Sequence, residues 1–216
     1  MPYYVRPMRK EDIAQVNKID REAFPTQWGS PNYRRELQNR LARYIVVCDE
    51  SKTIEEPEAK ISPEKGISRL VSGVRWWLSH HRFFGNKLRP SSSQYILGFA
   101  GIWAVADKAH LTNIAVRKQY QRQGIGEWLL ISMIDLAIEL KANTMTLEVR
   151  ASNTPAQSLY YKYGFNQVGV RRGYYSDNRE DGSIMSTESI TSASFQARLQ
   201  KLKQAHFRKY GIGNNW

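Results

Sequence analysis

The feature of the sequence that most constrains its fold is an alternation of strand and helix patterns between residues 110 and 170. In chain order, the patterns are a strand at 110–116, a helix from about 124 to 140, a strand at 145–150, a helix opened by Thr154-Pro155 and closed at Gly164, and a strand at 165–170. Apolar residues have strand or helix spacing within each segment, and Thr-Pro is a typical helix start. This β-α-β-α-β order predicts the α/β class, with a mixed, twisted sheet and helices on both faces.

The rest of the chain is expected to extend this unit. Further patterns predict a strand at 3–7, helices over 13–23 and 33–41, and strands at 44–48 and 95–105. Glu- and Pro-rich residues 51–65 predict a solvated linker, and the apolar stripe of 67–88 predicts a basic helix. We therefore expect a domain over 1–189 with a helical insertion at about 51–94, followed by a basic, helical C-terminal tail over 190–216.

Composition limits the kind of protein. The 216 residues are 41% hydrophobic and 24% charged, as in globular domains, and no apolar run approaches the roughly 18 residues of a spanning helix. The single cysteine, Cys48, lies in an apolar strand pattern and is expected to be packed rather than nucleophilic. The N-terminus lacks the apolar core of a secretion signal. We expect a cytoplasmic protein without a transmembrane segment or a metal site.

The net charge of +12 is unevenly distributed. The excess of Lys and Arg lies mainly in residues 51–98 and 191–216, whereas the segment between 99 and 190 is nearly neutral. Two basic appendages would suit contact with an acidic partner, such as ribosomal RNA or an anionic membrane surface. The alternative is that the charge serves solubility alone.

A short basic loop with two glycines connects the strand at 110–116 to the next helix. Its residues 121–126 read Gln-Arg-Gln-Gly-Ile-Gly. The first backbone N–H groups of a helix lack partners within it, the helix dipole favours an anion there, and glycines allow close approach. The loop therefore predicts a phosphate or diphosphate site, with a glycine-dependent tight turn as the alternative. It is neither a dinucleotide fingerprint, because Leu129 replaces the third glycine, nor a P-loop, because no Lys-Ser/Thr follows.

Glu148 is the most unusual residue in the strand pattern at 145–150. It shares one face of the strand with Thr146 and Arg150, inside a sheet whose strands are usually apolar on both faces. A carboxylate there is costly unless paired or hydrated, and burial would raise its pKa toward neutrality, which suits a general base. We expect Glu148 to take a proton from a substrate amine, directly or through water. The alternative is a structural ion pair with Arg150.

Several motifs in one order resemble the GNAT superfamily of N-acetyltransferases, and within it the ribosomal-protein-alanine N-acetyltransferase (RimI) type. The motifs are the loop at 121–126, Asn-Ile-Ala-Val at 113–116, Leu-Glu-Val-Arg-Ala-Ser-Asn at 147–153, Leu-Tyr at 159–160, Tyr-Gly-Phe at 163–165, Arg-Gly-Tyr-Tyr at 172–175 and Arg-Glu-Asp at 179–181. The resemblance is good over 95–185, weak over 3–48 and absent from 51–94 and 190–216. It implies acetyl-CoA as co-substrate and direct acetyl transfer without a covalent enzyme intermediate.

The resemblance also implies a general acid. Tyr160 would donate a proton to the thiolate of CoA as it leaves. The alternative is that Tyr160 packs in the core with the neighbouring Tyr161 and Tyr163. Because successive helical residues differ by about 100°, only one of Tyr160 and Tyr161 can face the thiol.

The remaining site residues follow from the same resemblance. The residues implied in co-substrate binding are Ile114, Ala115, Val116, Arg122, Gln123, Gly124, Ile125, Gly126, Glu127 and Asn153. The Val116 N–H is the expected donor to the acetyl carbonyl and to the oxyanion formed from it. Asn153 would hydrogen-bond the pantetheine amides; the alternative is that it only forms a turn before the helix. Glu127 stands where this type often has a basic residue, so only its backbone N–H should help to bind the diphosphate. Tyr174 and Tyr175, expected in a loop before the last strand, would hold the substrate peptide.

The expected function is acetylation of the N-terminal amine of a protein, with the N-terminal alanine of a ribosomal protein as the candidate that the resemblance suggests. An α-amine, with an ordinary pKa of about 7.7–8.0, needs less help from a base than lysine at about 10.4. Acetylation of lysine or a small amine is the enzymatic alternative. A basic ribosome- or nucleic-acid-binding module that keeps the fold without catalysis is the non-enzymatic one.

Overall fold

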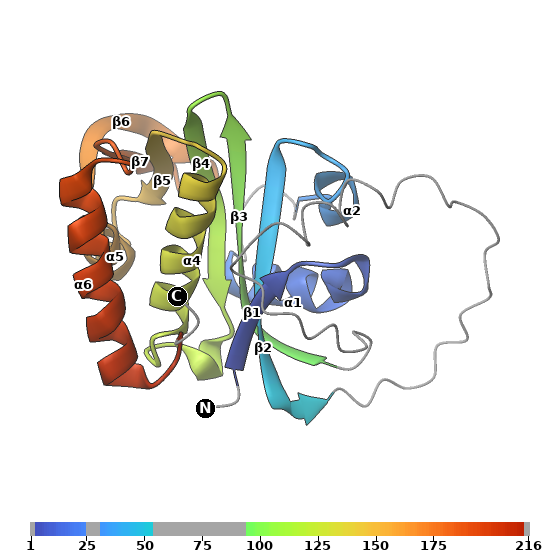
Figure 1. The fold of residues 1–216 in the computed structure, drawn as a ribbon. Helices are drawn as coiled ribbons and strands as arrows, with labels where there is room; N and C mark the ends of the chain where they lie inside the picture. The colour runs from blue at the N-terminus through green and yellow to red at the C-terminus, as the bar shows by residue number, and fades with distance from the viewer. Residues whose placement is uncertain (1–2, 25–30, 54–93, 214–216) are drawn as a thin grey trace.

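A mixed, twisted sheet forms the centre of the protein (Figure 1). The computed structural model describes residues 3–24, 31–53 and 94–213. In these residues the sheet has seven strands in the order β1-β2-β3-β4-β5-β7-β6. The strands are β1 (Tyr3–Pro7), β2 (Ala42–Thr53), β3 (Gln94–Val105), β4 (Lys108–Val116), β5 (Thr144–Arg150), β6 (Phe165–Tyr175) and β7 (Glu180–Thr187). The β4–β5 pair is parallel and the other pairs are antiparallel.

Helices cover both faces of this sheet. They are α1 (Ile13–Ala23), α2 (Tyr33–Glu36), α4 (Ile125–Glu139), α5 (Thr154–Lys162) and α6 (Ala193–Tyr210), with short 3-10 turns at Lys10–Asp12 and Lys118–Tyr120. Residues of α1 and α2 share one buried cluster with the sheet, and residues of α4, α5 and α6 share the other. The predicted α/β class is confirmed.

The strand β2 shows why the central strands are apolar on both sides. Val46 and Cys48 join the cluster under α1, whereas Ile45 and Val47 join the cluster under α4. Successive side chains of a strand point to opposite faces, so each face of the sheet receives its own core. Cys48 is fully buried, and burial raises the pKa of its thiol to about 11. The thiol is therefore packed in the core, as expected.

The two strands that open the site are β4 and β5. They pair only over Lys108–His110 and Thr144–Thr146, beyond which β5 remains paired with β7 alone. In the β3–β4 ladder the register shifts between Gly101 and Ile102, which leaves one extra residue in β4 and bends that strand. The ends of β4 and β5 therefore diverge and leave space between them.

Several element boundaries differ from those predicted. The helix predicted over 33–41 ends at Glu36, because Asn39 forms a turn in which its side chain accepts the Leu41 N–H. Leu41, expected on the buried stripe, is 48% exposed. The strand predicted at 44–48 extends to Thr53, and the strand predicted at 165–170 extends to Tyr175. The predicted helix at 67–88 and most of its linker lie outside the described residues.

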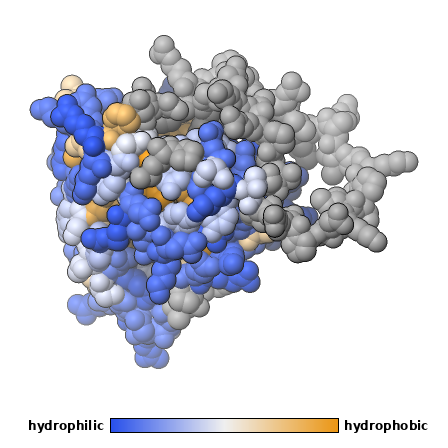
Figure 2. All heavy atoms as spheres, turned by 90° about the horizontal axis from the view of Figure 1, so that it is seen from below, coloured by the Kyte–Doolittle hydropathy of each residue, from blue (hydrophilic) through white to orange (hydrophobic). Residues whose placement is uncertain are grey.

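The C-terminal segment forms a regular helix. Ser192 caps α6 by accepting the Phe195 N–H, and Gly211 ends the helix in the left-handed conformation, with φ of +65°. In Figure 1, α6 runs alongside α4. Over the described ranges no helix has the length and apolar character needed to cross a membrane. Figure 2 shows mainly hydrophilic side chains on the described part of the lower face, with apolar colour in small areas between them.

Candidate active site

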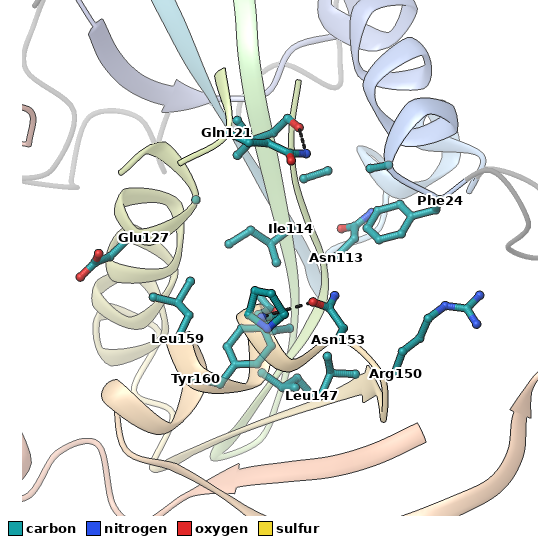
Figure 3. Close-up of a pocket in the computed structure, with 18 of the residues that line it drawn as sticks. Phe24, Asn113, Ile114, Gln121, Glu127, Leu147, Arg150, Asn153, Leu159 and Tyr160 are labelled. Carbon is teal, nitrogen blue, oxygen red and sulfur yellow. Dashed lines mark hydrogen bonds between the residues drawn. The ribbon is translucent and has the colours of Figure 1, made fainter. Parts of the chain in front are cut away.

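A pocket of about 490 Å³ lies where β4 and β5 diverge (Figure 3). Residues from seven parts of the fold meet there: the end of α1, the strands β4 and β5, the loop into α4, the first turns of α5, the end of β6 and the end of α6. The predicted site residues that line it are Ile114, Ala115, Val116, Arg122, Gly124, Gly126, Glu127, Glu148, Asn153, Tyr160 and Tyr175. The structure thus gathers residues from distant parts of the sequence around one cavity.

The start of α4 presents unpaired backbone amides to this pocket. Gly124 is the N-cap residue, in the left-handed conformation with φ of +84°, and no side chain from the described residues caps the helix there. A Cβ at Gly126 would meet only Val116, at 3.7 Å, so the glycine leaves its main chain accessible. Arg122, at the pocket wall, adds positive charge. Amides, a helix dipole and a guanidinium form a donor set that fits a diphosphate.

Two glutamine side chains hold the loop that leads into α4. The Gln121 amide donates to the carbonyl oxygen of Val116 at 3.2 Å, and the Gln123 amide donates to that of Gln119 at 3.1 Å. Gln123 and Ile125 were expected in the site but do not line the pocket. Ile125 is 1% exposed and packs in the core under α4, so its side chain anchors the helix instead.

The Glu127 side chain points away from the pocket. Figure 3 shows it on the outer side of α4, opposite Ile114 and Tyr160. Its carboxylate accepts hydrogen bonds from Lys162 at 2.5 Å and from the Tyr163 hydroxyl at 2.7 Å. Burial acts to raise the pKa of Glu127, but these two donors lower it overall. The carboxylate therefore joins α4 to α5 and does not oppose an anion at the helix start.

Glu148 lines the pocket from β5 and is held by a histidine and an arginine side chain. Its carboxylate lies 3.1 Å from His110 Nε2 and 3.3 Å from an Arg171 guanidinium nitrogen. The hydrogen bond from His110 lowers the pKa of Glu148, and this effect exceeds the opposite effect of burial. The expectation that burial would raise this pKa is therefore wrong. The carboxylate is ionised throughout the neutral range.

Arg150 is not the ion-pair partner of Glu148, contrary to the alternative considered above. Its guanidinium pairs with Asp177 at 2.9 Å and with Glu180 at 3.1 Å. It also lies 4.0 Å from the centroid of the Tyr175 ring, close enough for a cation–π contact. Arg150 thus ties the β6–β7 turn to the end of β5 and fixes Tyr175 at the pocket.

Three tyrosines at the end of α5, Tyr160, Tyr161 and Tyr163, point in different directions, as helical geometry requires. Tyr160 is 5% exposed and lines the pocket, whereas Tyr161 is 44% exposed. Tyr163 is buried and hydrogen-bonds Glu127. Burial raises the pKa of Tyr160 above its ordinary value, so its hydroxyl stays protonated at neutral pH. The hydroxyl can act as a proton donor.

Asn153 and the tyrosine pair occupy positions that differ in detail from expectation. Asn153 is the N-cap of α5, and its side-chain oxygen accepts the Ala156 N–H at 3.2 Å (Figure 3). Its amide nitrogen is the remaining polar group that a ligand could meet.

Tyr174 and Tyr175 end the strand β6 and are not in a loop. Tyr175 lines the pocket, while Tyr174 packs edge-to-face against it with centroids 5.2 Å apart.

Sequence reasoning missed several residues of this site. His110 and Arg171 hold Glu148, Phe24 and Gln121 line the pocket, and Tyr210 reaches it from α6. His110 stands directly opposite Thr146 in the β4–β5 ladder, two residues before Glu148. The pairing register, which periodicity does not encode, is what brings this histidine to the carboxylate. Within the described residues, no group of three or more potential metal ligands occurs.

The divergent strands, the open helix start and a pocket lined by both a carboxylate and a phenol fit an α/β acyltransferase. The sequence model of the Acetyltransferase (GNAT) family matches residues 13–165, and the chain belongs to this family.

Three known proteins illustrate the similarity. A protein of Bacillus subtilis, described as a putative [ribosomal protein bS18]-alanine N-acetyltransferase, is 33% identical over 182 residues, which cover 84% of this chain and 92% of the relative. An N-alpha-acetyltransferase of Sulfurisphaera tokodaii is 30% identical over 85% of this chain and 91% of its own. The crystal structure of the ribosomal-protein-S18-alanine N-acetyltransferase from Escherichia coli superposes with a TM-score of 0.61 and 26% identity, covering 88% and 97% of the two chains.

Proposed function

We propose that this acetyltransferase transfers an acetyl group from acetyl-CoA to the N-terminal α-amine of a protein. The observation that carries the proposal is one cavity, where β4 and β5 diverge, that is lined by the start of α4 and by both Glu148 and Tyr160. The named activities of the similar proteins from B. subtilis and S. tokodaii support it.

The residues around the pocket fit CoA in a defined order. The amides at the start of α4, together with Arg122, would hold the diphosphate. From Ile114 to Val116, β4 is paired with β3 but not with β5, so its edge toward β5 offers backbone groups that an extended pantetheine arm can match as an added strand would. The amide nitrogen of Asn153 would donate to a pantetheine carbonyl. Acetyl-CoA itself supplies the activated acetyl group as a thioester.

The proposed reaction is a direct transfer of the acetyl group from the CoA sulfur to the amine nitrogen. The neutral amine nitrogen attacks the acetyl carbon, a C–N bond forms, and the C–S bond breaks. The Val116 N–H would stabilise the oxyanion of the tetrahedral intermediate, and Tyr160 would protonate the departing thiolate. Glu148 would accept the proton that the amine loses. Because its pKa is lowered, Glu148 does not keep that proton and would release it to water.

The state of Glu148 bears on the choice of substrate. A carboxylate with a lowered pKa is a weak base, so it acts best on an amine that has a substantial neutral fraction near physiological pH. An N-terminal α-amine, with a pKa of about 7.7–8.0, meets this condition, whereas lysine at about 10.4 does not. This argument supports N-terminal acetylation over lysine acetylation. We propose the N-terminal alanine of a ribosomal protein as the specific target, following the activity named for the B. subtilis relative.

The test compares peptides and variants. A peptide with a free N-terminal alanine and no lysine is assayed beside an N-terminally blocked peptide that contains lysine, by release of free CoA thiol and by mass spectrometry. We expect acetylation of the first peptide only. Modification of the blocked peptide at an equal rate would favour the lysine alternative. Binding of acetyl-CoA without acetyl transfer to either peptide or to a small polyamine would favour a non-enzymatic module.

Variants locate the chemistry at the proposed site. We expect Glu148→Gln to abolish most of the transfer while leaving CoA binding intact. The exposed Glu188 is the matched control, and Glu188→Gln should retain full activity. Contact of the basic insertion or tail with ribosomal RNA or a membrane surface stays a prediction, because most of the insertion lies outside the described residues.

A further inference from the structure

The C-terminal helix α6 makes direct contact with the loop that begins α4. His206 Nε2 lies 3.0 Å from the carbonyl oxygen of Gly124, and the His206 side chain is almost fully buried. The Tyr210 ring lies so close that a Cβ added to Gly124 would stand 2.6 Å from two of its ring carbons. The residue that sets the shape of the anion-binding loop is therefore covered by the end of α6.

The hydrogen bond from His206 has a defined direction. A carbonyl oxygen only accepts hydrogen bonds, so the proton must reside on Nε2. The same carbonyl accepts the Trp128 N–H at 2.9 Å, which is the first hydrogen bond of the helix. Gly124 is thus held from both sides in its left-handed conformation, by its own helix and by α6.

The rest of α6 fixes the position of this contact. Lys203 forms a buried ion pair with Asp135 of α4 at 2.6 Å, and both side chains are less than 10% exposed. Arg198 donates to the carbonyl oxygens of Tyr161 and Lys162 at the end of α5, at 3.2 and 2.7 Å. The helix is therefore attached to α4 and α5 over most of its length, and it carries His206 and Tyr210 to the loop as part of a rigid unit.

Tyr210 also belongs to the wall of the pocket. It lines the cavity together with Gln121, Arg122 and Gly126 of the phosphate loop. The Lys209 ammonium lies 5.0 Å from the centroid of the Tyr210 ring, which brings a further positive charge to this end of α6. An aromatic face with a neighbouring cation, beside unpaired amides, is suited to the phosphorylated end of a nucleotide-like ligand.

We propose that the end of α6 is part of the co-substrate site, with Tyr210 as a CoA-binding residue and His206 as a positioning residue for the phosphate loop. This inference rests on the proposed use of acetyl-CoA and assigns a function to a helix outside residues 13–165, which the family model matches. Tyr210 covers Gly124 and faces the pocket, whereas His206 acts only through the Gly124 carbonyl. Both should influence CoA binding more than the chemical step.

The experiment measures equilibrium binding of CoA to the full chain by titration calorimetry, beside steady-state kinetics. We expect Tyr210→Ala to weaken CoA binding about tenfold and Tyr210→Phe to stay within about twofold, because the ring face makes the contact. His206→Ala should raise the KM for acetyl-CoA several-fold with little change in kcat or in the KM for peptide. His206→Gln, which keeps a donor, should restore much of the binding. The exposed Gln204 on the same helix provides the control Gln204→Ala.

Other results would overturn the inference. Native CoA binding in a folded Tyr210→Ala variant would remove Tyr210 from the site. A loss in Tyr210→Phe as large as that in Tyr210→Ala would contradict a contact made by the ring. Equal changes in the KM for peptide and for acetyl-CoA in His206→Ala would contradict a positioning role at the phosphate loop. If the native chain binds CoA but acetylates no N-terminus, the proposed function fails, and the binding comparison still decides the role of α6.

Discussion

His110 Nε2 and Glu148 Oε2 lie 3.1 Å apart at the last point where β4 and β5 run side by side. Beyond this contact the strands separate and the pocket begins. The histidine holds the carboxylate, lowers its pKa and leaves it ionised at the pocket wall. A base in this state accepts a proton only transiently, so the amine must be easily deprotonated and the proton must pass to water.

Replacing Glu148 by Gln should reduce kcat/KM for the peptide by about 10²–10⁴-fold, the usual contribution of a general base. The amide cannot accept a proton but keeps nearly the same shape. CoA affinity, measured by calorimetry, should change less than twofold. A variant with near-native turnover would contradict the assignment of Glu148 as base.

The pH dependence of kcat/KM should follow the substrate and not the enzyme carboxylate. The lowered pKa of Glu148 keeps it ionised above the usual range of carboxyl titration, so it adds no acidic limb near neutrality. Activity should rise with pH through an apparent pKa of about 7.7–8.0, where half of the α-amine has lost its proton, and should level off above it. Peptides whose N-terminal amines have different pKa values should shift this limb in parallel. A limb that stays fixed across such peptides would point to an enzyme group.

Tyr160→Phe should lower kcat by about 10²-fold or more, because the departing thiolate loses its proton donor. Since burial raises the pKa of Tyr160 above its ordinary value, its deprotonation should not reduce activity of the native protein up to pH 9.5. Stopped-flow and steady-state rates across pH 7–9.5 would check both points. Tyr161→Phe, at the exposed neighbour, is the matched control and should behave as the native chain does.

Lys203→Met should destabilise the fold by about 3 kcal/mol at pH 8, because it leaves the Asp135 carboxylate buried without its partner. Burial raises the pKa of Asp135 to about 6 even with Lys203 present, and removing the lysine should raise it further. The native state then binds a proton more tightly than the unfolded chain. Stability should therefore be retained at low pH and lost as the pH rises through that pKa.

Chemical denaturation of the Lys203→Met variant and the native protein at several pH values between 5 and 8 would measure this difference. The Lys203→Met variant should approach the native stability at the acidic end and diverge from it above pH 6. Lys201→Met, on the exposed side of the same helix, should show no such divergence. Parallel curves for the two proteins would exclude a stabilising role for the ion pair.

Gly124→Ala should destabilise the fold for two independent reasons. A left-handed backbone costs a non-glycine residue about 1–2 kcal/mol, and the added Cβ would collide with the Tyr210 ring. In combination with Tyr210→Ala the collision disappears but the backbone cost remains. The double variant should then lose less stability than the sum of the two single variants, as measured in a double-mutant cycle. Strict additivity would show that Tyr210 does not contact Gly124.

Local patterns were enough to predict the strand–helix order, the glycine start of α4 and the position of Tyr160 on α5. Helix starts, glycine conformations and side-chain periodicity depend on neighbours within a few residues, so they can be read along the chain. The same reasoning failed where residues distant in the sequence determine the charge state or the position of a side chain. It predicted a raised pKa for Glu148, named only Arg150 as an alternative partner for that carboxylate and placed Tyr174 and Tyr175 in a loop.

The sequence by itself determined which residues could carry the chemistry: a carboxylate within an apolar strand, a phenol one helix later and two glycines at a helix start. Only the tertiary structure decided their state. The β4–β5 register brought His110 and the β6 strand brought Arg171 to Glu148, and the docking of α6 placed Tyr210 on Gly124. Charge and hydrogen-bond energies depend on separations of a few ångströms in space, which strand pairing and helix docking set and spacing along the chain does not.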